Sequence, residues 1–403
     1  MIVGRVEKHV INKNHTMYSI CDELCFQAKN VYNYANYVMR QEFINIGKII
    51  KYNDLTFQLK HSDPFKELGS NSSQHVLKML CKSWKSFLIS IKDYSKNPSK
   101  YLGRPRIPKY KDKNGRYTCV LTNMQSQIKD GYLYFAFTRM KPFNNLIKTK
   151  IQGHHMCTRI VPKGGCYVLE IVYEKEIQPV DLDKARIASI DLGLNNFITM
   201  VNNIGEKPII VNGKGIKSYN QYWNKQMAKY KSISKTTNKL DWTNRLCRMT
   251  DKRNNKMDYF MHCASKFVVD SCLESNIGTI VIGKNKEWKQ ESNMRKTVNQ
   301  HFVQLPYESF INKLKYKCED YGIDLIETEE SYTSGTSFLD NELPTKENYD
   351  KSRRKHRGLF ISNKGVKINA DVNAAYQIMK KVSPNAFANG VEGLDLIPLV
   401  INL

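Results

Sequence analysis

The chain has 403 residues, which favours two or three folded domains, and its 63 lysines and arginines outnumber 38 aspartates and glutamates to give a net charge of +25. Such an excess favours a polyphosphate partner, although a ribosomal-type protein or a solubilised surface would share it. Ten scattered cysteines without a Cys-x-x-Cys pair exclude a secreted disulfide framework. With neither a signal-like start nor a long apolar run, the sequence predicts a soluble, intracellular protein.

The first part of the chain alternates between β-rich and helical patterns. Apolar residues recur at every third or fourth position in two stretches, 20–46 and 75–95, which is typical of packed helices. Short alternating runs separated by Gly-bearing turns follow, among them YTCVL and CYVLEIVYEK. We therefore expect 1–18 and 97–180 to form one β-rich domain that is interrupted by a helical insertion at 19–96.

A basic segment rich in tyrosine, KYLGRPRIPKYKDKNGRY, occupies residues 100–117. Its two prolines disfavour a helix, and an extended basic segment with aromatic residues suits phosphates and stacked bases. A linker would have a similar composition but rarely holds three tyrosines. We predict nucleic-acid contacts from Arg104, Arg106, Lys109, Tyr110 and Lys111.

The second part of the chain shows a different order of elements. RIASIDLGLNNFITMVNN predicts a strand, a tight turn at Gly193 and a second strand, and a long basic helical stretch follows at 218–275. Further elements are expected as strands at 279–285 and 323–330, a helix at 307–322, and a last helix opening at Asp371. This order, β-β-(β)-α-β-α-β-α, is that of the RNase H-like α/β fold.

Two acidic residues stand where such a sheet holds catalytic metals. Two-metal hydrolysis of a phosphodiester needs carboxylates from separate strands, and Mg²⁺ prefers oxygen ligands. Asp191 follows an apolar run on the expected central strand, and Asp371 opens the final helix within NADVNAAYQI, where Asn373 is expected to face the metal or the backbone. A structural turn and a helix N-cap are the alternative roles for these acids taken singly.

The stretches ASIDLGLNNF and NADVNAAYQI resemble those of TnpB proteins. So do AKNVYNYANY, GRPRIPKYK, TIVIGKNKEWKQ and YGIDLIETEESYTS, and the resemblance covers nearly the whole chain. The resemblance implies a transposon-encoded, RNA-guided DNA endonuclease with a RuvC-like domain, related to the type V CRISPR nucleases. A guide RNA would pair with the target strand, while the protein reads a short adjacent motif in double-stranded DNA and cuts with Mg²⁺. We expect a monomer on one guide RNA, with a dimer as the alternative, in the prokaryotic cytoplasm near the nucleoid and away from membranes.

The resemblance also implies a multidomain α+β architecture. Its expected parts are a β-barrel wedge domain (1–18 and 97–180), a helical recognition insertion (19–96), a RuvC-like nuclease domain (181–330 and 367–385) with a basic helical lid (218–275), a target-nucleic-acid-binding insertion (331–366) and a C-terminal tail (386–403). In the insertion at 331–366, which contains KSRRKHR, we predict that Arg353 and Arg354 bind nucleic acid.

The chain departs from the family pattern at the second acid, because Gly283 ends the strand that normally carries it. The neighbouring strand ends in three glutamates, and adjacent strands lie only about 4.8 Å apart, so a glutamate there can reach the same place. Glu330 is the favoured second acid and Glu329 the alternative, while Glu287 is a weaker candidate. A solvated strand end is the structural alternative for this acidic run.

A second departure concerns zinc. Many relatives carry two Cys-x-x-Cys pairs before the last acid, whereas this chain has Ser337, Asp340, Ile361 and Lys364 there. We predict no zinc, and expect this loop to be held by packing or by nucleic acid. The predicted cofactor is a pair of Mg²⁺ ions bound by Asp191, Glu330 and Asp371.

Three functions follow from these patterns. The leading hypothesis is an active RNA-guided nuclease. The second is an RNA-guided DNA-binding repressor whose nuclease has decayed, which Gly283 favours and the retained acids disfavour. The third is a DNA strand-transfer enzyme, since integrases share the fold, but the β-rich domain and its helical insertion disfavour it.

Overall fold

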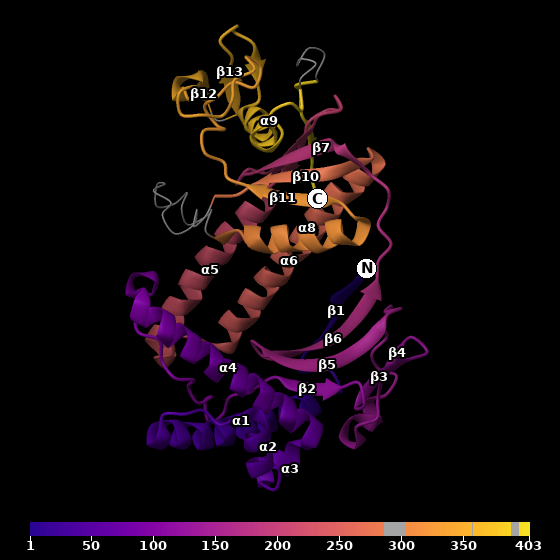
Figure 1. The fold of residues 1–403 in the computed structure, drawn as a ribbon, viewed down its shortest axis with the longest axis vertical. Coiled ribbons are helices and arrows are strands. Elements are labelled where there is room, and N and C mark those ends of the chain that lie inside the picture. Colours follow the sequence, from indigo (N-terminus) through magenta and orange to yellow (C-terminus); the bar gives the residue numbers. More distant parts are fainter. Residues whose placement is uncertain (286–303, 357, 388–394) are drawn as a thin grey trace. The chain divides into compact units, whose positions relative to one another are not determined.

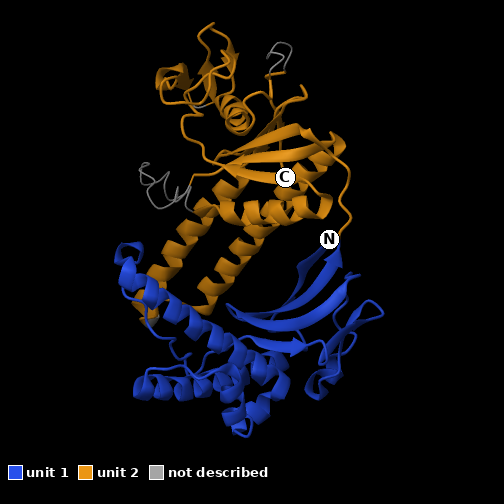
Figure 2. Ribbon diagram, in the orientation of Figure 1, with its two compact units in different colours: residues 1–176 blue, residues 177–403 orange. Residues whose placement is uncertain are grey.

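The computed structural model describes residues 1–285, 304–356, 358–387 and 395–403. The chain divides into two compact units, Met1–Glu176 and Ile177–Leu403 (Figure 2). No helix within the described residues is both long enough and apolar enough to cross a membrane. Glu287, the weakest candidate for the second acid, lies outside the described residues.

Unit 1 combines a sheet with a group of helices (Figure 1). The sheet has the order β1 (Ile2–Ile11), β6 (Cys166–Glu176), β5 (His154–Lys163), β2 (Cys119–Thr122), and β3 (Ser126–Lys129) pairs with β4 (Tyr132–Phe135) in a separate hairpin. Between β1 and β2 the chain forms α1 (Tyr18–Ile46), α2 (Tyr52–Leu59), α3 (Asp63–Leu68) and α4 (Ser70–Lys96).

The sheet of unit 1 is open, so the expected closed barrel is not formed. Every residue of 1–176 is described, and the edge strands β1 and β2 do not pair with each other. The reason lies in β2, which has only four residues and leads into the separate hairpin instead of extending the sheet. Mixed α and β structure is confirmed, whereas the barrel is a correction.

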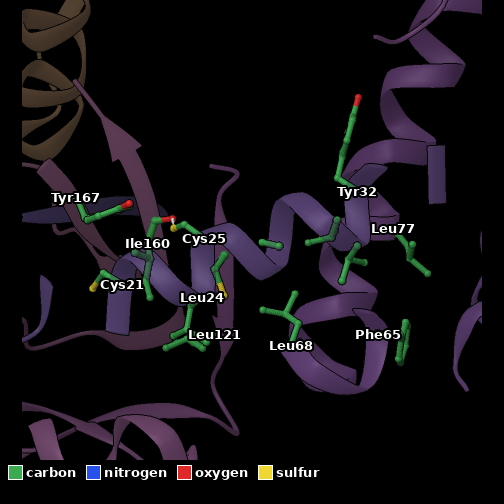
Figure 3. Packing of buried hydrophobic residues seen from close by; sticks show 14 of the residues in the cluster. Cys21, Leu24, Cys25, Tyr32, Phe65, Leu68, Leu77, Leu121, Ile160 and Tyr167 are labelled. Carbon is green, nitrogen blue, oxygen red and sulfur yellow. Dashed lines mark hydrogen bonds between the residues drawn. The ribbon is translucent and has the colours of Figure 1, made fainter. Parts of the chain in front are cut away.

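One hydrophobic core joins the helices of unit 1 to its sheet. Cys21 and Leu24 of α1 pack in the same buried cluster as Leu121 of β2 and Ile160 of β5 (Figure 3). The cluster also contains Trp84 of α4, which is fully buried. The helices between β1 and β2 therefore share their core with the strands.

Unit 2 is built on a six-stranded sheet, ordered β11 (Asp324–Thr328), β10 (Ile277–Gly283), β7 (Asp183–Leu192), β8 (Asn196–Asn202), β9 (Ile209–Asn212) and β15 (Leu399–Ile401). β7, β8 and β9 pair antiparallel, whereas β10 and β11 run parallel to β7. Each residue of β10 is buried, as expected for a central parallel strand. These strands follow the order expected for an RNase H-like sheet.

Helices cover both faces of this sheet (Figure 1). The expected basic helical stretch forms α5 (Lys214–Asn238) and α6 (Asn244–Glu274), and α6 packs with α8 (Tyr307–Tyr321) in one hydrophobic cluster, while α9 (Ala370–Val382) belongs to another. The segment between β11 and α9 contains short strands, β12 (Arg354–His356), β13 (Leu359–Ile361) and β14 (Lys367–Ile368). The apolar end of the expected tail at 386–403 forms β15 alongside β9.

Candidate functional site

Three acidic side chains from distant parts of the chain line one pocket in unit 2. Asp191 is the second-last residue of β7, Glu330 follows the parallel strand β11, and Asp371 lies in the first turn of α9. The carboxyl ends of parallel strands meet at one edge of a sheet, which explains why the first two converge. The pocket has a volume of about 520 Å³. Its other polar lining residues include Asn195, Asn196, Lys214, Asn285 and Arg354.

Burial and mutual repulsion act on these carboxyl groups. Burial raises the pKa of Asp191 well above its usual value, and the negative charges of Glu330 and Asp371 raise it further. Burial also raises the pKa of Glu330 to about 7, against the opposing charge of Lys381. When carboxylates that repel one another line the same pocket, a cation bound between them stabilises the charged form of each.

Of Glu327, Glu329 and Glu330, at and just beyond the end of β11, only Glu330 lines this pocket. Glu329 points to the surface, where it pairs with Lys381 at 2.7 Å and accepts a hydrogen bond from Ser331. The Glu327 carboxylate is 3.0 Å from the ammonium group of Lys284. Both acids are therefore neutralised outside the pocket that Glu330 lines.

Gly283 provides the space that Glu330 occupies. A Cβ atom at position 283 would lie 2.7 Å from Cγ and Oε1 of Glu330 and 2.7 Å from Cδ1 of Ile378. Oε1 of Glu330 is buried and has no hydrogen-bond partner among the described residues. The glutamate side chain thus fills the volume at the end of β10 where a side chain of that strand would begin.

Asp371 is held by two donors and is not the cap of its helix. The N-cap is Asn369, whose side chain accepts from the backbone N–H groups of Asp371 and Val372. Arg354 donates to Oδ1 of Asp371 at 3.0 Å, and Asn196 donates to Oδ2 at 2.8 Å. The carboxylate is therefore oriented by a cation and an amide on opposite oxygens.

The structure also shows the surroundings of Asn373 and Gly193, two residues that the sequence placed near the site. Asn373 faces the backbone, since it accepts from the N–H of Phe338 and donates to the carbonyl of Thr336. Gly193 lies at the expected turn between β7 and β8, where a Cβ would lie 2.3 Å from the carbonyl oxygen of Asn196. The glycine is required by the close approach of the chain to itself.

The donor set fits a hard divalent cation without forming a complete cage. Within the described ranges, no group of three or more His, Cys, Asp or Glu side chains is arranged to hold a metal by itself. Mg²⁺ does not need such a group, because it keeps several waters and takes one or two carboxylates together with substrate phosphates. The unpartnered Glu330 oxygen and the acid-lined pocket suit that mode of binding.

The predicted nucleic-acid residues of unit 1 lie on an extended segment, 104–113, here called the basic strap. Its backbone carbonyls are bound by side chains of α1. Asn36 and Arg40 donate to the carbonyl of Pro108, and Lys29 donates to that of Lys113 at 2.8 Å. Some strap side chains are exposed, whereas Ile107 packs against the core of unit 1. The exposed ones include Arg104, Arg106, Lys109 and Tyr110.

Lys111 and Arg353 are less accessible than predicted. Lys111 is partly buried, with its ammonium group 4.9 Å from the ring centre of Tyr32 and 5.0 Å from that of Tyr117. Arg353 is only 8% exposed and is bound to Glu342 within unit 2. The expectation that Arg353 binds nucleic acid is therefore corrected, since its guanidinium is used inside the protein. Arg354 lines the acidic pocket.

Asn196 and Lys214 line the pocket but were not predicted from the sequence. Asn196 belongs to the LGLNN run directly after Asp191, so the motif contained a signal for it. Lys214 had no such signal. It reaches the pocket because α5 begins beside the β7–β8 turn, where Gly213 donates to the carbonyl of Asn195 at 2.7 Å.

Comparisons with known proteins agree with this description. A family model described as a probable transposase, OrfB_IS605, matches residues 170–289. A model of the TNB domain of Cas12f1-like proteins matches residues 307–378. The TnpB-like protein ORF457 of Acidianus two-tailed virus is 24% identical over 391 residues, covering 88% of this chain and 81% of the relative.

Solved structures share the fold. A Cas12f1–sgRNA–target DNA complex matches with a TM-score of 0.54 and 16% identity over 90% of this chain and 82% of the other. The mini-RNA-guided endonuclease CRISPR-Cas_phi3 matches with a TM-score of 0.50 and 11% identity over 98% and 94%. Both likenesses concern the mixed α and β architecture. Two family models and a relative matched over most of its length thus show that the chain is similar to TnpB-like proteins.

Proposed function

We propose that the chain is an RNA-guided, Mg²⁺-dependent endonuclease that cuts double-stranded DNA beside a short recognised motif. The observation that carries the proposal is the convergence of Asp191, Glu330 and Asp371 on one pocket. The comparisons support it, because the similar structures are named as an RNA-guided endonuclease and as a complex with guide RNA and target DNA.

In this proposal Asp191, Glu330 and Asp371 are the catalytic carboxylates. They would hold two Mg²⁺ ions, which would supply activation of the attacking water and neutralisation of charge on the leaving oxygen. The protein supplies the position of each ligand: Asn285 accepts from the N–H of Glu330 at 2.9 Å, and Asn196 orients Asp371. These contacts fix the carboxylates before substrate arrives, so that little reorganisation is needed during reaction.

The cations of the pocket are suited to a phosphodiester. Lys214 and Arg354 line it together with the three acids. Arg354 pairs with Asp371 in the free chain, and its planar guanidinium can also bind phosphate. A DNA strand entering the pocket would therefore meet positive charge beside the metal ligands, which attracts the backbone and offsets its repulsion by the carboxylates.

The basic strap is the proposed nucleic-acid surface of unit 1. Its exposed arginines and lysine suit phosphate contacts, and Tyr110 suits stacking on a base. Such contacts read the backbone and shape of a nucleic acid, while base pairing with a guide supplies the target sequence. One chain on one guide RNA is the proposed assembly.

The decisive experiment is cleavage of target DNA by the purified protein with its co-purifying RNA, with and without Mg²⁺. Glu330→Ala should retain DNA binding and lose cleavage. The cleavage rate should fall by more than the roughly 10- to 100-fold that is typical when a residue hydrogen-bonded to a metal ligand is removed. Glu329→Ala is the matched control, and it should cut normally because its carboxylate pairs with Lys381 at the surface.

The outcomes separate the candidate functions. Wild-type protein that binds guided DNA tightly without cutting would identify a repressor, and joined DNA products would identify a strand-transfer enzyme. Full cleavage by Glu330→Ala would show that the second acid lies elsewhere.

A second substitution tests the placement of Glu330 from the opposite side. Gly283→Ala adds one methyl group 2.7 Å from the Glu330 side chain and Ile378. We expect the glutamate to be displaced and cleavage to fall by about 100-fold, as for a misplacement of about 1 Å. Gly358→Ala at the pocket rim is not a clean control because of its positive φ, so Gly215→Ala, with open space around its Cβ position, serves instead. Equal rates for both variants would contradict the assignment.

A further inference from the structure

Three buried polar side chains lie along one side of α9. Asn373, Gln377 and Lys380 are each at most 2% exposed, and their spacing of four and three residues places them on one helix face. Each donates to a backbone carbonyl of the preceding segment. Asn373 binds that of Thr336 at 2.8 Å, while the other two bind that of Glu342, at 3.2 Å each. The orientation of α9 is therefore tied to this backbone.

Glu342 connects these helix contacts to a second set of bonds through its side chain. Oε2 accepts from the backbone N–H of Ser337 at 2.7 Å, and Oε1 accepts from Arg353 at 2.8 Å and from Asn363 at 3.2 Å. We call residues 331–366 the connecting segment. The backbone carbonyl of Glu342 binds α9, and its carboxylate binds three other points of this segment.

Arg353 binds further parts of the connecting segment from within. Its second terminal nitrogen donates to the carbonyls of Gly335 at 2.9 Å and Asn348 at 2.7 Å. The next residue, Arg354, begins β12 and donates to Asp371. The guanidinium that is buried and the guanidinium that reaches the pocket are therefore neighbours on one short piece of chain.

We propose that Arg353 and Glu342 form a positioning pair that sets α9, and with it Asp371, against the other two carboxylates. The pair holds the connecting segment, the segment holds the polar face of α9, and α9 carries Asp371 in its first turn. This inference rests on the proposed function for its cleavage readout, while its structural readout is independent.

Stability alone is a poor reason for such a pair. Two charges removed from water lose their hydration, and apolar residues of similar volume often stabilise a protein as well or better. What an apolar pair cannot supply is directional bonding to the carbonyls of Gly335 and Asn348 and to the N–H of Ser337. Geometry is the property that this pair contributes and a hydrophobic contact does not.

Two variants separate geometry from stability. Arg353→Met leaves the partly buried Glu342 carboxylate without its cation, and we expect it to lower the melting temperature and the cleavage rate together. The double variant Arg353→Met/Glu342→Leu removes both charges. It should melt at a higher temperature than the single variant, because no unpaired charge remains, yet cut guided DNA roughly 100-fold more slowly than wild type in single turnover at saturating Mg²⁺, the loss expected for a misplacement of about 1 Å. Lys355→Met, at an exposed position two residues away, is the control.

Hydrogen exchange of the α9 amides at 372–376 supplies the second readout. The double variant should exchange faster there, with target binding unchanged. Cleavage within about twofold of wild type, or slow cleavage with wild-type exchange in α9, would overturn the proposal. If the double variant does not fold, Arg353→Lys applies the same test, because it keeps the charge and loses carbonyl bonds. A wild-type chain that never cuts would defeat the proposed nuclease, and exchange alone would then decide the positioning role.

Discussion

The basic strap and the connecting segment use arginine in opposite ways. In the strap, side chains of α1 bind backbone carbonyls, and Arg104 and Arg106 are exposed. In the connecting segment, Arg353 itself binds the backbone carbonyls and is buried. Both segments have little regular secondary structure and carry a net positive charge. The comparison teaches that a cationic side chain is available for a ligand where other residues bind the backbone carbonyls of its segment, and is used up where it binds those carbonyls itself.

The largest expected contrast is in folding stability. Arg353→Ala should lower the free energy of unfolding by about 3 kcal/mol, because it leaves the partly buried Glu342 carboxylate without its cation. Arg104→Ala removes the same charge from an exposed position and should change it by less than about 0.5 kcal/mol. Chemical denaturation of both variants measures the difference. Equal losses would remove the distinction between the two segments.

The next contrast is in the salt dependence of nucleic-acid binding. Replacing Arg104, Arg106 and Lys109 with alanine should reduce the slope of log K against log salt for duplex DNA by about 2.7, or about 0.9 for each lost phosphate contact. Three exposed lysines of α4, Lys82, Lys85 and Lys92, give a variant with the same loss of charge. If that variant lowers the slope equally, the strap has no special role and the overall positive field accounts for binding.

The smallest expected effect concerns the support of the strap. Asn36→Ala removes one donor to the Pro108 carbonyl and the acceptor of the buried Trp84 N–H. Stability should fall by about 1–2 kcal/mol, since Arg40 still binds the same carbonyl. Binding of nucleic acid should weaken less than in the triple variant. Fluorescence anisotropy and thermal melting check both, and unchanged stability would show that α1 does not hold the strap through this residue.

The sequence predicted the three carboxylates that line the pocket, because their positions follow from element order. Asp191 and Asp371 stand at the ends of elements whose apolar patterns are strong, and the parallel strand pair brings Glu330 to the same edge. The choice between Glu330 and Glu329 needed coordinates, since adjacent residues of an irregular strand end point in directions that pattern does not specify. Glu329 turns out to pair with Lys381 at the surface.

The errors have a common physical cause. Local pattern predicts which element forms, but not which long-range partner a polar or edge residue finds. The burial of Arg353 depends on Glu342 and on two carbonyls distant in sequence. The strand at Leu399–Ile401 depends on a free edge of β9, and the open sheet of unit 1 depends on where the chain leaves β2. None of these is encoded within a short window.

The missing side chain at Gly283 has a consequence for how such sites can change. A carboxylate that starts at the end of β10 and one that arrives from beyond β11 compete for the same volume, so the two locations are mutually exclusive. Moving the acid from one strand to the other therefore requires paired replacement, with a loss on one strand accompanying each gain on its neighbour. Related sequences should accordingly show acid and small residue exchanging together at positions 283 and 330.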